Sequence, residues 1–301
     1  MSSDDSDFYG DDDVMIGLKA RVKNFDVDGW WEEYAALDTP LKLQARKKEV
    51  ADVSLLHNPY AGIKYAWQLT ETIQNFLERV PPATTDQTPD DPWIWVCNPY
   101  IKRQKKREAS NQLVRGGEDE APEEEGADLG SVIEGGMARL HLASKFISFC
   151  KSSGNQPALV TRECRKAGTD AAKDILDLAK AHRVKCGKWM LFCTVLQVNE
   201  IWEIVAKATA NNELGIAAKV APRLTTDKRT DRLICVYTAD FSDTNDVRRV
   251  AQRLKQLRLI QSDGRPLYYK PDVYTYLGIA HGNPWEIRAS IYDSTSMLKK
   301  A

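Results

Sequence analysis

The sequence predicts an α+β fold in which a mostly antiparallel sheet is covered by helices on one side. Segments with alternating apolar residues, the pattern of a strand with one buried face, are separated by segments with helical periodicity. Two of these strands, residues 214–220 and 232–238, are predicted to form a hairpin. Strands with one polar face that are separated by helices are typical of such an antiparallel sheet.

The N-terminal half is predicted to contain one strand and several helices. The strand, residues 93–97, carries Trp93 and Trp95 on one side because strand side chains alternate. A helix is predicted at residues 62–80 from an apolar face that consists of Ile63, Trp67, Thr70, Ile73 and Leu77. Further helices are predicted at residues 30–34, at 137–151, and from Thr169 or Asp170 to His182.

The C-terminal half alternates more regularly between strands and helices. The predicted elements are, in order, a strand at 187–192, a helix at 198–210, the hairpin, a helix at 246–257, and strands at 274–279 and 285–292. Trp189 and Trp202 lie on apolar faces of the first strand and the first helix, so both are predicted to belong to the core.

One domain is predicted at residues 26–301, preceded by a disordered acidic N-terminus at 1–25. A disordered, charged insert is predicted at about residues 102–136. It begins basic, turns acidic, and has too few apolar residues to offset the entropy of ordering. We interpret it as a solvated loop; the alternative is that its basic cluster, residues 102–107, contacts RNA or acts as a localisation signal.

Composition excludes several classes of protein. The 301 residues carry a net charge of −1, so a globally basic nucleic-acid binder is not expected. No apolar run is long enough to cross a bilayer and the N-terminus does not resemble a secretory signal, which predicts a cytoplasmic or nuclear protein. The 6 cysteines include no Cys-x-x-Cys pair, so we expect buried, reduced thiols and neither a disulfide framework nor a zinc site.

Motifs of catalysis are not found in the sequence. It contains no Walker loop, Rossmann glycine pattern, nucleophile elbow or His-Glu-x-x-His helix. The 4 histidines are isolated from one another and from obvious partners. A non-enzymatic protein without a cofactor is therefore predicted.

Two resemblances suggest a family. Gly187-Lys188-Trp189-Met190-Leu191, Ile201-Trp202, Gly215-Ile216-Ala217-Ala218, Leu233-Ile234-Cys235-Val236-Tyr237 and the helix at 246–257 resemble, in order and rough spacing, the C-terminal half of the cap-binding translation initiation factor 4E. The closing stretch, residues 269–279, together with the Gly-Lys-Trp-Met segment resembles the basophilic leukaemia-expressed protein family, whose function is unassigned. This second resemblance covers most of the chain beyond residue 25.

The resemblance implies a curved sheet, helices on its convex face, and a nucleotide site in its concave face. It places cations for phosphate contact at Lys219, Arg223, Lys228, Arg229 and Arg232. The two tryptophans that hold the cap base in the initiation factor are not found at the matching positions, since residues 102–136 contain no aromatic side chain and 181–186 no tryptophan. Trp93 and Trp95 could stack on bases instead, or they could belong to a buried sheet face.

These observations together predict a non-catalytic binding protein. We expect it to bind RNA or a capped or phosphorylated nucleotide through the concave sheet face. The alternative is a protein–protein adaptor that uses the convex helical face and binds no nucleotide.

Overall fold

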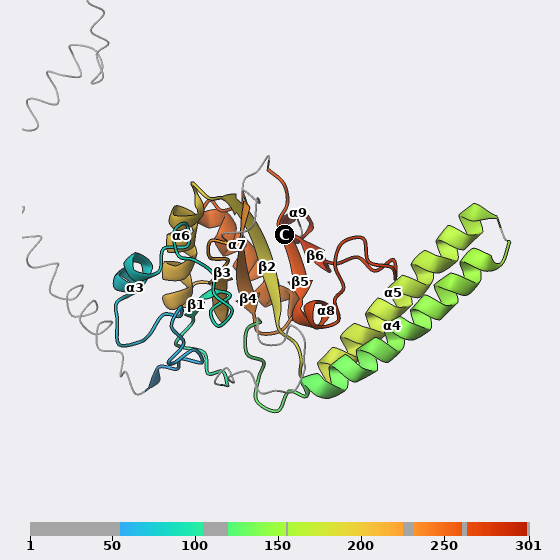
Figure 1. Ribbon diagram of the computed structural model, residues 1–301, viewed down its shortest axis with the longest axis horizontal. Coiled ribbons are helices and arrows are strands. Elements are labelled where there is room, and N and C mark those ends of the chain that lie inside the picture. Colours follow the sequence, from blue (N-terminus) through green and yellow to red (C-terminus); the bar gives the residue numbers. More distant parts are fainter. Residues whose placement is uncertain (1–54, 105–119, 155, 225–230, 261–263, 300–301) are drawn as a thin grey trace, which may run out of the picture. The chain divides into compact units, whose positions relative to one another are not determined.

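The computed structural model describes residues 55–104, 120–154, 156–224, 231–260 and 264–299. All of these residues except Leu55 belong to the compact unit Leu56–Ala301, in which an open six-stranded sheet has the strand order β1-β3-β4-β2-β5-β6 (Figure 1). The strands are β1 (Ile94–Cys97), β2 (Gly187–Thr194), β3 (Ala217–Val220), β4 (Asp231–Thr238), β5 (Tyr268–Pro271) and β6 (Tyr292–Asp293). Every neighbouring pair is antiparallel, so the predicted α+β class and antiparallel sheet are confirmed.

The strand register defines the two faces of the sheet. Residues directly opposite each other on neighbouring strands point to the same face. Ala218, Val236, Trp189 and Tyr269 form one such row, and all four belong to the large apolar core. We call this the helical face. A row on the opposite side runs through Trp95, Lys219 and Cys235, and a second one through Tyr237, Lys188 and Lys270; we call this side the front face.

Two amphipathic helices cover the helical face. These are α6 (Val198–Ala210) and α7 (Thr244–Gln256), whose apolar residues belong to the same core as that face. The Trp189 indole on β2 donates a hydrogen bond to the Val247 carbonyl of α7 at 3.1 Å, which joins sheet and helix. Two shorter helices, α3 (Ile73–Arg79) and α9 (Ser294–Lys299), contact α6 and α7 respectively.

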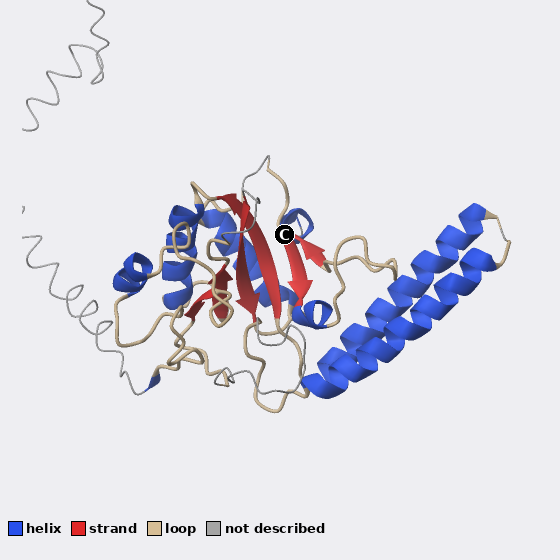
Figure 2. Ribbon diagram, in the orientation of Figure 1, coloured by secondary structure: helices blue, strands red, loops and turns tan. Residues whose placement is uncertain are grey.

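Two long helices, α4 (Leu129–Ser152) and α5 (Pro157–Ala181), form an antiparallel hairpin that extends away from the sheet (Figure 2). Its sheet-proximal part packs against the short helix α8 (Asp272–Tyr276) and the loop that follows it. The Trp285 indole donates to Ser144 Oγ at 2.8 Å. Gly168 lies so close to the Trp285 carbonyl that a Cβ there would meet its oxygen at 2.3 Å. None of the described helices is both long enough and apolar enough to span a membrane.

Most predicted elements of the C-terminal half are confirmed, and two are wrong. Residues 274–279 were expected to form a strand, but Tyr274 and Tyr276 lie in α8, which ends before Gly278 at φ +70°. Residues 285–292 were expected to form a strand, but only Tyr292–Asp293 pairs, because the partner strand β5 offers only Tyr268 and Tyr269 in register. The residues before Tyr292 form a loop instead, in which the Asn283 side-chain amide donates a hydrogen bond to the Ile287 carbonyl.

The predicted helices of the N-terminal half need three changes. The helix expected at 62–80 begins only at Ile73, after the N-cap Thr72. Before it, Ala66 pairs with Trp95 and the Gln68 amide binds three carbonyl oxygens, which replaces helical hydrogen bonding. The helices expected from 137 and from 169 or 170 begin earlier, at Leu129 and Pro157. The helix expected at 30–34 and the boundary at residues 25–26 lie outside the described residues.

The insert predicted at 102–136 is wrong in its second half. Glu120 and Ala121 are buried on the front face, and α4 begins at Leu129 after the N-cap Asp128. The Glu120 side chain is only 4% exposed. An acidic run predicts a solvated loop, because a carboxylate is buried only where counter-charges compensate it. Here Lys188 and Lys219 of the sheet provide those counter-charges for Glu120. Residues 105–119 lie outside the described part of the chain.

Candidate functional site

The front face of the sheet, where the sequence predicts the nucleotide site, is covered by the chain itself. The Tyr60 ring stacks on Trp95, with a centroid distance of 4.8 Å and an interplanar angle of 25°. Trp95 stacks in turn on Tyr237 at 5.9 Å. Tyr60 is fully buried and Trp95 is 2% exposed. The surface on which a base would stack is therefore occupied by Tyr60.

A buried ion cluster lies beside this aromatic stack. Glu120 Oε2 accepts a hydrogen bond from Lys188 Nζ at 2.6 Å and another from the Tyr237 hydroxyl. Glu120 Oε1 lies 3.4 Å from Lys219 Nζ. Lys188 Nζ also donates to Asp272 Oδ1 at 2.8 Å. Lys219 Nζ lies 4.0 Å from the centroid of the Trp93 ring, a cation–π contact that adds to the attraction of the carboxylate.

These contacts keep Glu120 ionised despite its burial. Burial by itself raises the pKa of Glu120, but the charges of Lys219 and Lys188, and the hydrogen bonds from Lys188 and Tyr237, lower it to about 2. Burial likewise lowers the pKa of Lys188, and the charges of Asp272 and Glu120 outweigh this and raise it above the ordinary lysine value. The charges of Lys188 and Lys219 are thus balanced inside the protein.

The structure brings together only some of the side chains predicted to contact a nucleotide. Lys219, Trp93 and Trp95 meet on the front face. Arg232 lies on the helical face, opposite Cys193 in the β2–β4 register. Arg223 follows β3 and forms an exposed ion pair with Asp86, with Nε 2.7 Å from Oδ1. Lys228 and Arg229 lie outside the described residues, and nucleotide binding by any of these side chains stays a prediction.

Predictions about the core are confirmed more fully. Trp189 and Trp202 are fully buried on the helical side. All six cysteines lie in the described ranges and are buried with free thiols. Burial raises the pKa of several of them, including Cys97 to about 12, which favours the protonated thiol at neutral pH in the absence of a bound group.

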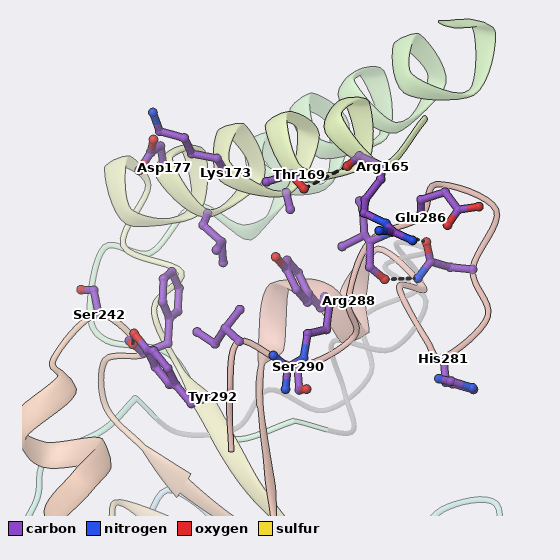
Figure 3. A pocket seen from close by; sticks show the side chains of 18 of the residues that line it. Arg165, Thr169, Lys173, Asp177, Ser242, His281, Glu286, Arg288, Ser290 and Tyr292 are labelled. Carbon is purple, nitrogen blue, oxygen red and sulfur yellow. Dashed lines mark hydrogen bonds between the residues drawn. The ribbon is translucent and has the colours of Figure 1, made fainter. Parts of the chain in front are cut away.

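An open cavity of about 980 Å³ lies between α5 and the segment 281–292 (Figure 3). Its floor is apolar and aromatic and includes Phe241, Tyr274 and Tyr292. The Tyr292 hydroxyl is held by the Phe241 carbonyl at 3.1 Å, which fixes one wall. The volume lies at the upper end of the range of about 300–1,000 Å³ that is usual for small-molecule sites.

The rim of this cavity is rich in cations. Arg165 and Lys173, two turns apart on α5, line it together with Arg288 from the facing segment. Lys180 is paired with Asp177 at 2.6 Å, and Arg288 lies 3.6 Å from Asp293. Arg165 and Lys173 have no salt-bridge partner within 4.0 Å in the described ranges, but Asp177, whose pKa is lowered by its hydrogen bond from Lys180 and by the charges of Lys180 and Lys173, lines the same cavity. The lining holds more cations than carboxylates, since only Asp177 and Glu286 are acidic, and an apolar floor under such a rim suits an anionic ligand that carries a ring or another apolar group.

Sequence reasoning missed this cavity. Arg165, Thr169 and Lys173 recur every four residues and therefore share one face of a helix, a signal that was available. It was overlooked because the helix was predicted to begin at Thr169 or Asp170, which leaves Arg165 outside it. The facing wall was predicted as a strand, so no cavity was expected there.

The tip of the α4–α5 hairpin carries an exposed apolar stripe, which we define as Leu142, Phe146 and Phe149. These residues follow one another at spacings of four and three, so they lie on one face of α4. Their exposed fractions are 66%, 44% and 68%. Ile147 and Cys150 of α4 pack instead against Cys164 of α5 and hold the two helices together.

The fold and its sites define the class of protein. An open antiparallel sheet with two helices on one face and a long helical hairpin beside a ligand-sized cavity define an α+β protein. Within this class the sequence identifies the family directly. The model of the family described as basophilic leukemia-expressed protein Bles03 matches residues 18–278. The match covers most of the chain, and the protein belongs to this family.

Proposed function

We propose that the protein is a non-catalytic binding protein with a fold like that of initiation factor 4E, and that it binds a phosphorylated nucleotide in the α5 cavity. The open antiparallel sheet backed by α6 and α7 supports the fold likeness. The cavity replaces the front face as the proposed site because Tyr60 and Glu120 already occupy the aromatic and cationic groups of that face.

The observation that carries this proposal is that Arg165 and Lys173 line a cavity whose floor is aromatic. A nucleotide has an anionic phosphate part and a flat base. The cationic rim of this cavity can contact the phosphate, and its aromatic floor can contact the base. Hydrogen bonds from a cationic side chain to phosphate contribute about 1.5–3 kcal/mol each, which is sufficient for micromolar binding when two of them act together with ring burial.

Calorimetric titration with ATP, GTP, a methylated cap analogue and inorganic phosphate tests this site. Arg165→Ala and Lys173→Ala are expected to weaken binding of the preferred nucleotide by about tenfold or more each. The matched control is Lys166→Ala, which removes a neighbouring cation that lies on the same helix and does not line the cavity. Binding should also weaken with salt in the wild type and less steeply in the two variants.

The same titration separates the cavity from the front face. If Lys219→Met or Trp93→Ala abolishes binding while Arg165→Ala leaves it unchanged, the nucleotide lies on the sheet and the cavity proposal is wrong. If none of the four probes binds the wild-type chain, nucleotide binding as such is wrong.

A second candidate function is that of a protein–protein adaptor, and the apolar stripe Leu142, Phe146 and Phe149 favours it. Exposed apolar side chains that are contiguous on one helix face are typical of protein interaction sites. A partner recovered with the wild-type chain should bind directly when purified. It should be lost with Phe146→Ser and Phe149→Ser and retained with Arg165→Ala. Retention by both serine variants contradicts the adaptor role of the hairpin.

A further inference from the structure

Three side chains of the types that bind metal ions lie together at the edge of the front-face ion cluster. Glu123, Cys186 and Asp272 each offer one ligand atom, and these three atoms lie within 4.8 Å of one another. Cys186 and Asp272 are buried and Glu123 is half-buried. Glu123 comes from the segment before α4, Cys186 precedes β2, and Asp272 begins α8.

The two carboxylates are held in place by one oxygen each. Glu123 Oε2 accepts backbone hydrogen bonds from Lys185 at 3.0 Å and from Cys186 at 3.1 Å. Asp272 Oδ1 accepts the hydrogen bond from Lys188, and the Asp272 amide is bound by the Cys186 carbonyl at 2.9 Å. Secondary contacts of this kind orient the ligands of protein metal sites.

The remaining oxygens have no partner among the described residues. Glu123 Oε1 and Asp272 Oδ2 are buried without a hydrogen bond, although Asp272 is completely inaccessible to solvent. The hydroxyl of Tyr60, which is also fully buried, likewise has no hydrogen-bond partner among the described residues. Burial raises the pKa of Glu123, and the Arg103 guanidinium lies near enough to oppose this rise by its charge, but its Nε is buried without a hydrogen-bond partner among the described residues. A buried carboxylate oxygen left without any partner is costly, so these atoms indicate that a further group binds between them.

We propose that Glu123, Cys186 and Asp272 bind a divalent cation of the zinc type. A thiolate together with carboxylates suits zinc and cobalt better than magnesium or calcium, which prefer oxygen ligands alone. In a tetrahedral zinc site the ligand atoms lie about 3.5 Å from one another, so the three side chains must move inward by up to about 1 Å to reach bonding distance. Binding replaces the thiol proton of Cys186, which is released to solvent as the sulfur–metal bond forms.

The expectation of no zinc site rested on the spacing of cysteines along the sequence. Glu123 and Cys186 are separated by 63 residues, so a search for paired ligands could not find this group. The proposal does not depend on nucleotide binding, because the trio does not line the α5 cavity.

Cobalt(II) titration of the full chain after treatment with a chelator tests the proposal. A cobalt–thiolate charge-transfer absorption is expected in the wild type, with saturation at one ion per chain. Zinc should displace cobalt and raise the unfolding temperature. Cys186→Ser should abolish the absorption and weaken zinc binding by at least about 100-fold. Asp272→Asn, which keeps the side-chain shape, should weaken zinc binding in the same direction.

The matched control is Cys235→Ser, which removes another buried thiol of the front face and should leave the cobalt absorption unchanged. Circular dichroism of each metal-free variant shows whether it folds, and if Asp272→Asn does not fold, Cys186→Ser decides. The proposal is overturned if the wild-type chain gives no cobalt–thiolate absorption, if zinc leaves its unfolding temperature unchanged, or if the absorption persists in Cys186→Ser. A buried water or a shared proton then satisfies the two oxygens.

Discussion

Glu120 and Lys219 meet inside the protein, with Oε1 and Nζ 3.4 Å apart and both side chains almost completely buried. One belongs to an acidic stretch that looks solvated in sequence, and the other was expected to point into an open nucleotide site. Their contact closes the front face, because the same carboxylate also binds Lys188 and Tyr237. Glu120 and Ala121, at the start of the loop at residues 120–128, are thus part of the folded core.

Replacing Glu120 should destabilise the protein strongly. Glu120→Gln preserves shape but leaves Lys219 and Lys188 without the shared counter-charge, and breaking a buried ion pair on one side costs about 3–5 kcal/mol. Urea denaturation measures the loss in the free energy of unfolding. The control is Glu124→Gln, whose partly exposed carboxylate lies 3.5 Å from Lys185 and should contribute less than about 1 kcal/mol. Equal losses in the free energy of unfolding for the two substitutions would show that the buried ion pair stabilises the protein no more than the exposed one.

The contribution of Glu120 should depend on pH in a defined direction. Its pKa in the folded protein, about 2, lies below the ordinary value of 4.5, so the folded state favours the ionised form. The stabilisation is therefore complete above about pH 4.5 and is lost as the pH falls toward 2. The difference in unfolding free energy between wild type and Glu120→Gln should therefore shrink as the pH falls from 4.5 toward about 2. A difference that grows in acid contradicts the assignment.

Tyr60 should stabilise the front face through its ring and not through its hydroxyl. Tyr60→Ala removes the ring that stacks on Trp95, and we expect a loss of about 3–5 kcal/mol in the free energy of unfolding. Tyr60→Phe removes only a buried hydroxyl without a hydrogen-bond partner in the described chain, so its effect should stay within about 1 kcal/mol. Denaturation measures both, and near-ultraviolet circular dichroism reports the environment of Trp95. A large effect of Tyr60→Phe would reveal a partner for that hydroxyl.

Gly168 should be needed for the contact between α5 and the loop at 285–287. A Cβ at this position meets the Trp285 carbonyl oxygen at 2.3 Å, and backbone cannot rotate away as a side chain can. Gly168→Ala is expected to destabilise the protein by about 1–3 kcal/mol and to distort the cavity. Gly130→Ala is the matched control, because its Cβ would lie 3.7 Å from Asp128 and alanine favours a helix by up to about 1 kcal/mol. If Gly168→Ala and Gly130→Ala have the same free energy of unfolding, the close approach of the Trp285 carbonyl does not restrict the side chain at position 168.

The sequence by itself determined the strands of the β3–β4 hairpin, the apolar faces of α6 and α7, and the family. These features depend on residue periodicity and local spacing, which a single segment contains in full. Short apolar runs were less certain. Residues 274–279 fit either a strand or a helix, and contact of Tyr274 and Leu277 with the core selects the helix.

Only the tertiary structure decided which charged side chains are buried and which side chains share a site. Alternation along the chain says that Lys219 and Trp95 can face the same way, but not that Tyr60 covers them. One counter-charge of Lys188 is Glu120, 68 residues away, and Arg232 lies on the opposite face because of its register with Cys193. A charge is buried only where a partner from elsewhere in the chain compensates its desolvation, and that partner is set by the three-dimensional fold.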